Sequence, residues 1–207
     1  MSALCKCDLS IIVPVYNLEE YINPLLVTLK SQDLGGYAVE TIFVLNNCTD
    51  HTEDVIRASR YPCKIITCDI QGCGPARNAA LEIAQGEFVW FMDGDDWLLS
   101  DTAIKDALDA VQGHDIIRIP YASEKFTWNY FSMVWQYVFR REFIQEFRFP
   151  DYQPSEDDAY TEMVLRKAGY NRYDYMTMPA IKQPLYFYNY LRKDSNMYRV
   201  NVLGMRI

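Results

Sequence analysis

The alternation of short apolar runs with amphipathic segments constrains this chain more than any other feature. The first run, Leu9–Val15 (LSIIVPV), is rich in β-branched residues and lacks polar–apolar alternation, which is typical of a strand buried on both faces. Similar runs recur through the first 120 residues, separated by segments with apolar residues at helical spacing. Strands and helices that alternate over short connections predict βαβ units and an α/β fold with a mostly parallel sheet.

The expected elements are strands at residues 9–15, 41–45, 64–68, 88–92, 115–119 and 184–191, and helices at 18–32, 50–60, 75–84, 101–112 and 155–168. Residues 121–152 are irregular and rich in aromatic side chains. We expect one domain over residues 1–207, with a nucleotide-binding half up to about residue 120 and an aromatic-rich acceptor half and tail beyond it.

The hydropathy of the chain limits where in the cell we expect the protein, and its charge limits which partners we expect it to bind. No apolar segment approaches the roughly 20 residues of a transmembrane helix, and the first seven residues lack the basic and apolar regions of a secretory signal, so we expect a cytoplasmic protein. The net charge of −8 disfavours binding of phosphate polymers by the body of the chain. Residues 161–207 hold eight Lys and Arg against three Asp and Glu, so the tail stays open to lipid phosphate at the inner membrane face or to nucleic acid.

The strongest motif is the acidic turn at residues 91–97 (FMDGDDW), where Asp93, Asp95 and Asp96 follow an expected strand directly. Carboxylates at the carboxyl end of a parallel strand project into the crevice where α/β folds bind ligands. Three crowded carboxylates favour a cation between them, and hard oxygen ligands suit Mg²⁺ or Mn²⁺. A solvated turn that caps the next helix is the plainer alternative.

Two motifs follow the first two expected strands. In residues 12–17 (IVPVYN), Tyr16 can stack on a base and the backbone near Pro14 can edge the ring; a strand-to-helix turn with a packed tyrosine explains the pattern equally well. In residues 44–50 (VLNNCTD), the amides of Asn46 and Asn47 can pair with a base edge or with ribose hydroxyls, or can form an Asx turn that caps a helix.

Two further motifs open expected helices. In residues 72–78 (GCGPARN), small residues let the backbone approach a ligand, and Arg77 and Asn78 lie in the first turn, where a helix favours anions. In residues 155–158 (SEDD), one carboxylate can act as a general base if it faces the metal site. Capping of the helix N-terminus is the simpler explanation of these acidic residues.

The order and spacing of these five motifs resemble the family 2 glycosyltransferases, which are inverting enzymes with the GT-A fold. The resemblance is specific from about residue 9 to about residue 97. It continues more loosely through Trp135, the segment at 140–143 (RREF), the Glu156–Asp157 pair and the segment at 184–188 (PLYFY). These later features are similar to the enzymes that build bacterial cell-surface polysaccharides.

The resemblance implies roles for individual residues. Asp93 and Asp95 would hold Mn²⁺ or Mg²⁺ on the diphosphate of the donor, and Asp157 would be the catalytic base, with Glu156 beside it. The nucleotide-sugar would be bound by Pro14, Val15, Tyr16, Asn46, Asn47, Gly72, Arg77, Asn78, Asp93 and Gly94. The expected reaction is transfer of the sugar, with inversion, to a hydroxyl of a glycan or lipid-linked acceptor.

Two departures from the family pattern affect which nucleotide-sugar we expect the protein to use as donor. Asn46 stands where the family usually has an acidic residue, which weakens the default expectation of a UDP-sugar. Ile70 and Gln71 precede Gly72, where the family has an asparagine. A non-catalytic homologue that only binds a nucleotide-sugar stays open, as does an enzyme that glycosylates modified nucleic-acid bases.

The aromatic half is the expected acceptor side. Trp128, Trp135 and Tyr137 have flat apolar faces on which sugar rings can stack. Large aromatic side chains also fill hydrophobic cores, and for each of these residues that explanation is the more ordinary one.

Overall fold

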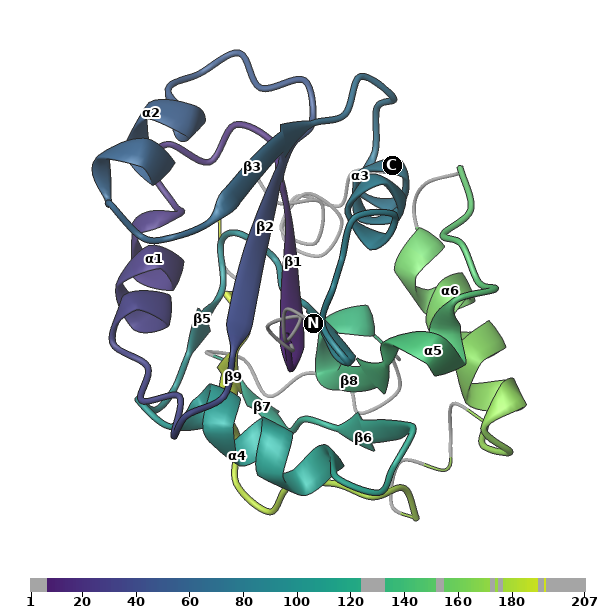
Figure 1. Cartoon of the computed structure of the whole chain (residues 1–207). Helices are drawn as coiled ribbons and strands as arrows, with labels where there is room; N and C mark the ends of the chain where they lie inside the picture. Colours follow the sequence, from purple (N-terminus) through teal and green to yellow (C-terminus); the bar gives the residue numbers. More distant parts are fainter. Residues whose placement is uncertain are drawn as a thin grey trace, which may run out of the picture.

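The computed structural model describes residues 7–123, 133–151, 155–171, 174, 177–189 and 192. Its centre is a six-stranded sheet in the order β3-β2-β1-β4-β8-β6, shown in Figure 1. The strands are β1 (Leu9–Val15), β2 (Val39–Leu45), β3 (Lys64–Thr67), β4 (Phe88–Phe91), β6 (Ile116–Arg118) and β8 (Tyr137–Arg140). Strands β3, β2, β1 and β4 are parallel, and β8 is antiparallel to both of its neighbours. The expected α/β fold with a mostly parallel sheet is confirmed.

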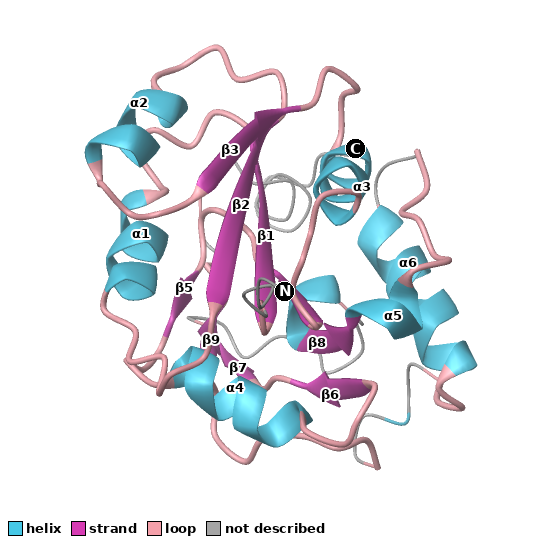
Figure 2. Cartoon of the chain, in the orientation of Figure 1, coloured by secondary structure: helices cyan, strands magenta, loops and turns pink. Residues whose placement is uncertain are grey.

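Helices cover both faces of the sheet (Figure 2). The helices α1 (Asn23–Lys30), α2 (Thr52–Ala58) and α4 (Ala103–Val111) share one hydrophobic core with Ile11 and Val13 of β1. The helices α3 (Cys73–Leu81), α5 (Arg141–Ile144) and α6 (Glu156–Lys167) share a second core with Ile12. All seven residues of β1 are buried, because alternate side chains enter opposite cores.

A second, three-stranded sheet forms beside the first from β5 (Trp97–Leu98), β9 (Tyr186–Phe187) and β7 (Tyr121–Ala122), and a short 3-10 helix covers Val134–Gln136. Strand β9 pairs antiparallel with β5 and parallel with β7. This pairing brings a segment near the end of the described chain against the segment that follows the acidic turn.

Several elements differ from the sequence-based expectation. The first helix begins at Asn23 instead of residue 18, with proline at its first positions, because proline is tolerated in the first turn of a helix and disrupts its interior. Strand β8 was not predicted, since it lies in the aromatic-rich stretch without a clear periodicity. Trp135 and Tyr137 are buried in the cores, so they do not offer faces to an acceptor, and Trp128 lies outside the described residues.

Among the described residues, no helix has the length and hydropathy needed to cross a membrane. Of the eight basic residues in 161–207, Arg166, Lys167, Lys182 and Arg192 lie within the part that the structure describes.

Candidate active site

The acidic turn lies where β4 ends, beside the end of β1. The Met92 N–H donates to the Ile12 carbonyl at 2.9 Å, which continues the β4–β1 ladder by one residue. Gly94 allows the turn to pack closely against β1, because a Cβ atom there would lie 2.6 Å from Leu18 Cδ1 and 3.1 Å from Val15 Cγ1. The carboxylates are therefore held at the carboxyl edge of the sheet, as the sequence predicts.

The three carboxylates of the turn have different surroundings. Asp96 is fully buried and accepts hydrogen bonds from the Tyr186 hydroxyl at 2.6 Å and from the Asn189 N–H at 2.8 Å. Burial, followed by the charges of Asp95 and Asp93, raises the pKa of Asp96 well above its ordinary value. Asp96 thus anchors the turn to the segment that contains β9, whereas Asp93 and Asp95 remain partly exposed.

Arg77 of α3 joins the acidic turn to α6. Its Nη2 lies 2.9 Å from Asp93 Oδ1, and its Nη1 lies 3.0 Å from Glu156 Oε1. The guanidinium also lies over the ring of Phe149, with 5.3 Å between Cζ and the ring centroid. Burial alone would lower the pKa of Arg77, but the negative charge of Asp93 and its neighbours raises it, so the side chain keeps its positive charge.

Asp157 follows Glu156 in the first turn of α6, and its side chain belongs to the same electrostatic cluster. Burial raises the pKa of Asp157 to about 6; Arg77 opposes this shift, and Glu156 and Asp93 add to it. A carboxyl group with a pKa near neutrality can accept a proton at physiological pH more effectively than an ordinary aspartate. The structure thus brings together the two carboxylate motifs predicted from the sequence.

Asn78 lies one residue beyond Arg77, and its amide is used within the protein. Its Nδ2 donates to the Phe149 carbonyl and its Oδ1 accepts from the Phe149 N–H, both at 2.9 Å. Gly74 lies against the same segment, because a Cβ atom there would lie 2.8 Å from the Pro150 carbonyl oxygen. Both residues therefore hold the 149–150 segment against α3, which keeps the Phe149 ring beside Arg77.

We expect Asn78→Ala to lower the free energy of unfolding by about 1–3 kcal/mol, because it leaves the peptide groups of Phe149 without their partners in a partly buried place. Urea denaturation measures the change. Gln145→Ala, which removes an exposed amide from the same part of the chain, serves as the control and should change stability by less than about 0.5 kcal/mol. Equal effects of the two substitutions would contradict the proposed role of Asn78.

The predicted base-binding residues lie at the ends of β1 and β2. Pro14 and Val15 are buried in β1, and Tyr16 is 54% exposed. Asn46 is 5% exposed and faces the loop after β3, whereas Asn47 is exposed and donates to the Asp69 carbonyl at 3.4 Å. Gly72 lies immediately before α3 with a φ of +126°, a conformation that favours glycine.

A divalent cation fits the chemistry of Asp93 and Asp95. Among the described residues, no group of three or more His, Cys, Asp or Glu side chains could hold a metal ion alone. Mg²⁺, however, is commonly bound by one or two carboxylates together with substrate phosphates. Burial raises the pKa of Asp95 to about 6, with Arg192 opposing and Asp93 adding to the shift, and a cation would stabilise the ionised pair.

Three residues of this region were missed by the sequence analysis: Tyr186, Asn189 and Arg192. Tyr186 and Asn189 each make a further hydrogen bond to the turn besides the one to Asp96. The Tyr186 hydroxyl accepts from the Asp93 N–H at 3.0 Å, and Asn189 Nδ2 donates to the Asp95 carbonyl at 3.2 Å. Arg192 Nε lies 3.2 Å from Asp95 Oδ2. The available signal for Asn189 was a polar residue in the otherwise aromatic segment 184–191, whereas Tyr186 had none because it is one of several tyrosines there.

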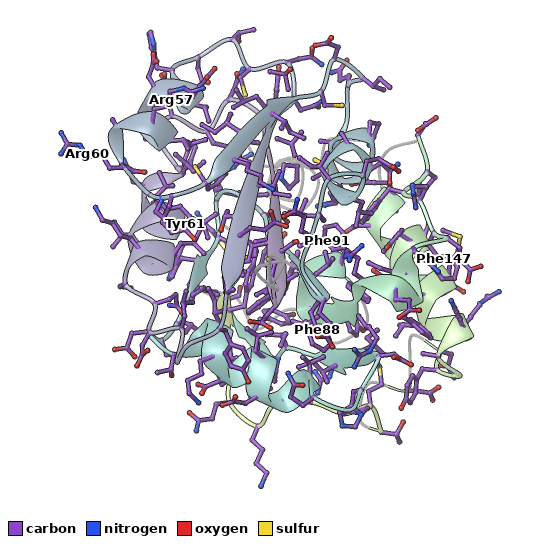
Figure 3. All side chains as sticks on the ribbon, viewed as in Figure 1. Arg57, Arg60, Tyr61, Phe88, Phe91 and Phe147 are labelled. Atoms are coloured by element: carbon purple, nitrogen blue, oxygen red, sulfur yellow. The ribbon has the colours of Figure 1, made fainter. Side chains whose placement is uncertain are left out.

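A groove of about 300 Å³ lies elsewhere, along the exposed edge of β3. It is lined by Ile56, Arg57, Tyr61, Cys63 and Ile65, and Figure 3 shows Arg57 on α2 and Tyr61 below it, both away from Phe91 of β4. None of the residues predicted to bind donor or metal lines this groove, so it is separate from the candidate active site.

Comparison with known proteins gives consistent matches. Poly(ribitol-phosphate) beta-N-acetylglucosaminyltransferase TarS of Staphylococcus aureus is 37% identical over 109 residues, which cover 51% of this chain and 19% of TarS. A crystal structure of TarS 1–349 in complex with UDP-GlcNAc superposes with a TM-score of 0.76 at 25% identity, over 92% of this chain and 60% of that one.

A mannosyltransferase from Pyrobaculum calidifontis, crystallised with GDP-Man and Mn²⁺, shares the fold with a TM-score of 0.71 at 18% identity, over 93% of this chain and 59% of that one. This chain spans about a fifth of the length of full TarS. The sequence model of glycosyl transferase family 2 matches residues 10–176. Since that match covers most of the chain, the protein belongs to glycosyl transferase family 2 and has the GT-A fold.

Proposed function

We propose that this protein transfers a sugar from a nucleoside-diphosphate sugar to a hydroxyl group of a glycan or polyol-phosphate polymer, with inversion at the anomeric carbon. The observation that carries the proposal is the Arg77 bridge, which joins the acidic turn to the Glu156–Asp157 pair, although Glu156 lies 79 residues after Arg77 in the sequence. The bridge supports a single site that contains both the acidic turn, proposed to bind the donor, and Asp157, whose pKa is near neutral.

In the proposed reaction, Asp157 accepts the proton of the acceptor hydroxyl, whose oxygen attacks the anomeric carbon opposite the leaving nucleotide. The bond between the anomeric carbon and the diphosphate breaks, and the nucleoside diphosphate leaves with the electron pair. Asp93 and Asp95 would hold Mg²⁺ or Mn²⁺, which supplies positive charge for the leaving diphosphate when bound. Tyr16, exposed at the end of β1, would stack on the base.

The relatives suggest which substrates to test first. TarS is named for a poly(ribitol-phosphate) acceptor and was crystallised with UDP-GlcNAc, and the mannosyltransferase was crystallised with GDP-Man. UDP-GlcNAc is therefore the first donor to test, GDP-Man the second, and poly(ribitol phosphate) the first acceptor.

Thermal unfolding in the presence of donor tests the proposal directly. At a donor concentration of about 100 times Kd, binding should stabilise the protein by about 2.7 kcal/mol, and the shift should depend on Mn²⁺ or Mg²⁺. Asp95→Asn should abolish the metal-dependent part of the shift, whereas Glu162→Gln, at a half-exposed position on α6, should preserve it. A protein that no nucleoside-diphosphate sugar stabilises, with either metal, would contradict the proposal.

A further inference from the structure

The loop between β3 and α3, residues 68–72, runs along the carboxyl edge of the sheet and is held mainly by the side chain of Asn46, with one longer bond from Asn47 to the Asp69 carbonyl at 3.4 Å. Asn46 Nδ2 donates to the Cys68 carbonyl at 2.9 Å and to the Ile70 carbonyl at 2.7 Å. Asn46 Oδ1 accepts from the Gly72 N–H at 2.8 Å. The side-chain amide thus contacts three peptide groups of the loop, and both of its N–H bonds are used.

The backbone around Asn46 fixes the direction of its side chain. The Asn46 N–H donates to the Val15 carbonyl and the Cys68 N–H donates to the Leu45 carbonyl, both at 2.9 Å. These bonds extend the β1–β2–β3 ladder by one residue, so Asn46 lies between the ends of two neighbouring strands. With only 5% of its surface exposed, the side chain is oriented into the loop.

The hydrogen-bond donors and acceptors of the peptide groups around the Asn46 side chain suit an asparagine and exclude an aspartate. Two carbonyl oxygens require donors within hydrogen-bond distance, and an ionised carboxylate has none. Aspartate at this position would place a negatively charged oxygen against the carbonyls of Cys68 and Ile70, which is repulsive in a buried place.

This pattern connects the two departures from the family sequence. Asn46 replaces the usual acidic residue, and Ile70 lies in the segment where the family asparagine before Gly72 is missing. In the structure, the first of these residues donates a hydrogen bond to the backbone of the second. The two departures therefore belong to one local arrangement of the loop.

We propose, building on the proposed function, that Asn46 is a positioning residue: it sets the path of loop 68–72 and the start of α3, and it does not contact the nucleotide base. Gly72, whose N–H donates to Asn46 Oδ1, is the residue immediately before α3, and its carbonyl accepts the Ala76 N–H at 3.3 Å. Arg77 follows directly, so the loop that Asn46 holds also places the residue that bridges the two acidic motifs.

The alternative, in which Asn46 contacts the base, predicts the opposite result for Asn46→Asp. A carboxylate restores the usual family residue and should tighten UDP binding selectively if the side chain faces the base. If Asn46 is a positioning residue, the same substitution should weaken binding of UDP, GDP and ADP by a similar factor of about ten and leave their order unchanged.

Calorimetric titration with UDP, GDP and ADP, together with hydrogen exchange of the free protein, tests the proposal. Asn46→Asp should speed exchange of amides in residues 68–76 by about tenfold, while Gln145→Glu, the same amide-to-carboxylate change at an exposed residue outside the loop, should leave that exchange unchanged. If Asn46→Asp does not fold, Asn46→Ser should give the same uniform loss with a smaller factor.

Tighter or selectively altered UDP binding by Asn46→Asp, with unchanged exchange at residues 68–76, would overturn the proposal. The exchange experiment needs no donor. If the wild-type protein binds no nucleoside diphosphate, the proposed function fails, and faster exchange in Asn46→Asp still supports the positioning role, whereas unchanged exchange rejects it.

Discussion

Replacing Arg77 by methionine is expected to lower the free energy of unfolding by about 3–5 kcal/mol, because its removal leaves the buried Glu156 and the partly exposed Asp93 without a counter-charge. Arg77 is 3% exposed and pairs with Asp93 and Glu156, so two acidic groups lose their partner together. Methionine keeps most of the packing volume beside Phe149, which limits the contribution of an empty cavity. Urea denaturation at neutral pH measures the loss.

The control for Arg77→Met is Arg166→Met, which removes an arginine from an exposed ion pair with Glu162 on α6. Such surface pairs contribute about 0–1 kcal/mol, so this variant should remain close to the wild type. Arg77→Lys keeps the charge but loses the planar fork that reaches both acids, and an intermediate stability is expected. If Arg77→Met is as stable as Arg166→Met, the ion cluster does not stabilise the fold.

Asp157→Asn is expected to reduce kcat by about 10²–10⁴, because the acceptor hydroxyl loses the group that takes its proton. The donor KM should change little, since Asp157 acts on the acceptor and the acidic turn stays intact. Both kcat and the donor KM are obtained from the rate at which the nucleoside diphosphate is released, with a donor that has been shown to bind. Glu162→Gln, one helical turn and a half further along α6, should retain wild-type turnover.

The pH dependence of the reaction gives a second test of Asp157. Its pKa is raised to about 6, so the carboxyl is protonated below that pH and cannot act as a base. Wild-type kcat/KM should therefore rise as pH increases through about 6 and level off above it. The residual activity of Asp157→Asn should lack this rise, and near wild-type turnover in that variant would rule out the assigned base.

The parallel part of the fold could be predicted because each strand there is a local apolar run. Leu9–Val15 was predicted with its observed bounds, since burial on both faces imposes a pattern that is visible within seven residues. Strand β8 was not predictable in the same way. It lies in an aromatic-rich stretch, and its place between β4 and β6 depends on pairing with residues far away in the sequence.

The residues of the candidate site divide in the same way, into those that a local pattern predicts and those that depend on distant parts of the chain. Asp93, Asp95 and Arg77 could be proposed from motifs, because each lies in a recognisable local pattern at the end of a strand or near the start of a helix. Arg77 and Asn78 were expected in the first turn of that helix, but α3 begins at Cys73, ahead of the proline, so both lie in its second turn. The direction of the Asn46 amide could not, since it depends on carbonyl groups of loop 68–72. The buried state of Asp96 also could not, because its partner Tyr186 is 90 residues away.

The contact between Asp96 and Tyr186 has a consequence for how the chain folds during its synthesis. A nascent polypeptide that has left the ribosome as far as β4 already contains the parallel strands β1, β2, β3 and β4, and domains commonly begin to fold from the N-terminal side. Asp96, however, must remain hydrated until Tyr186 and Asn189 emerge and donate to its carboxylate. The acidic turn would thus acquire its final shape only after the parallel strands have formed, so that translation stopped before these residues would yield the sheet with Asp96 still hydrated.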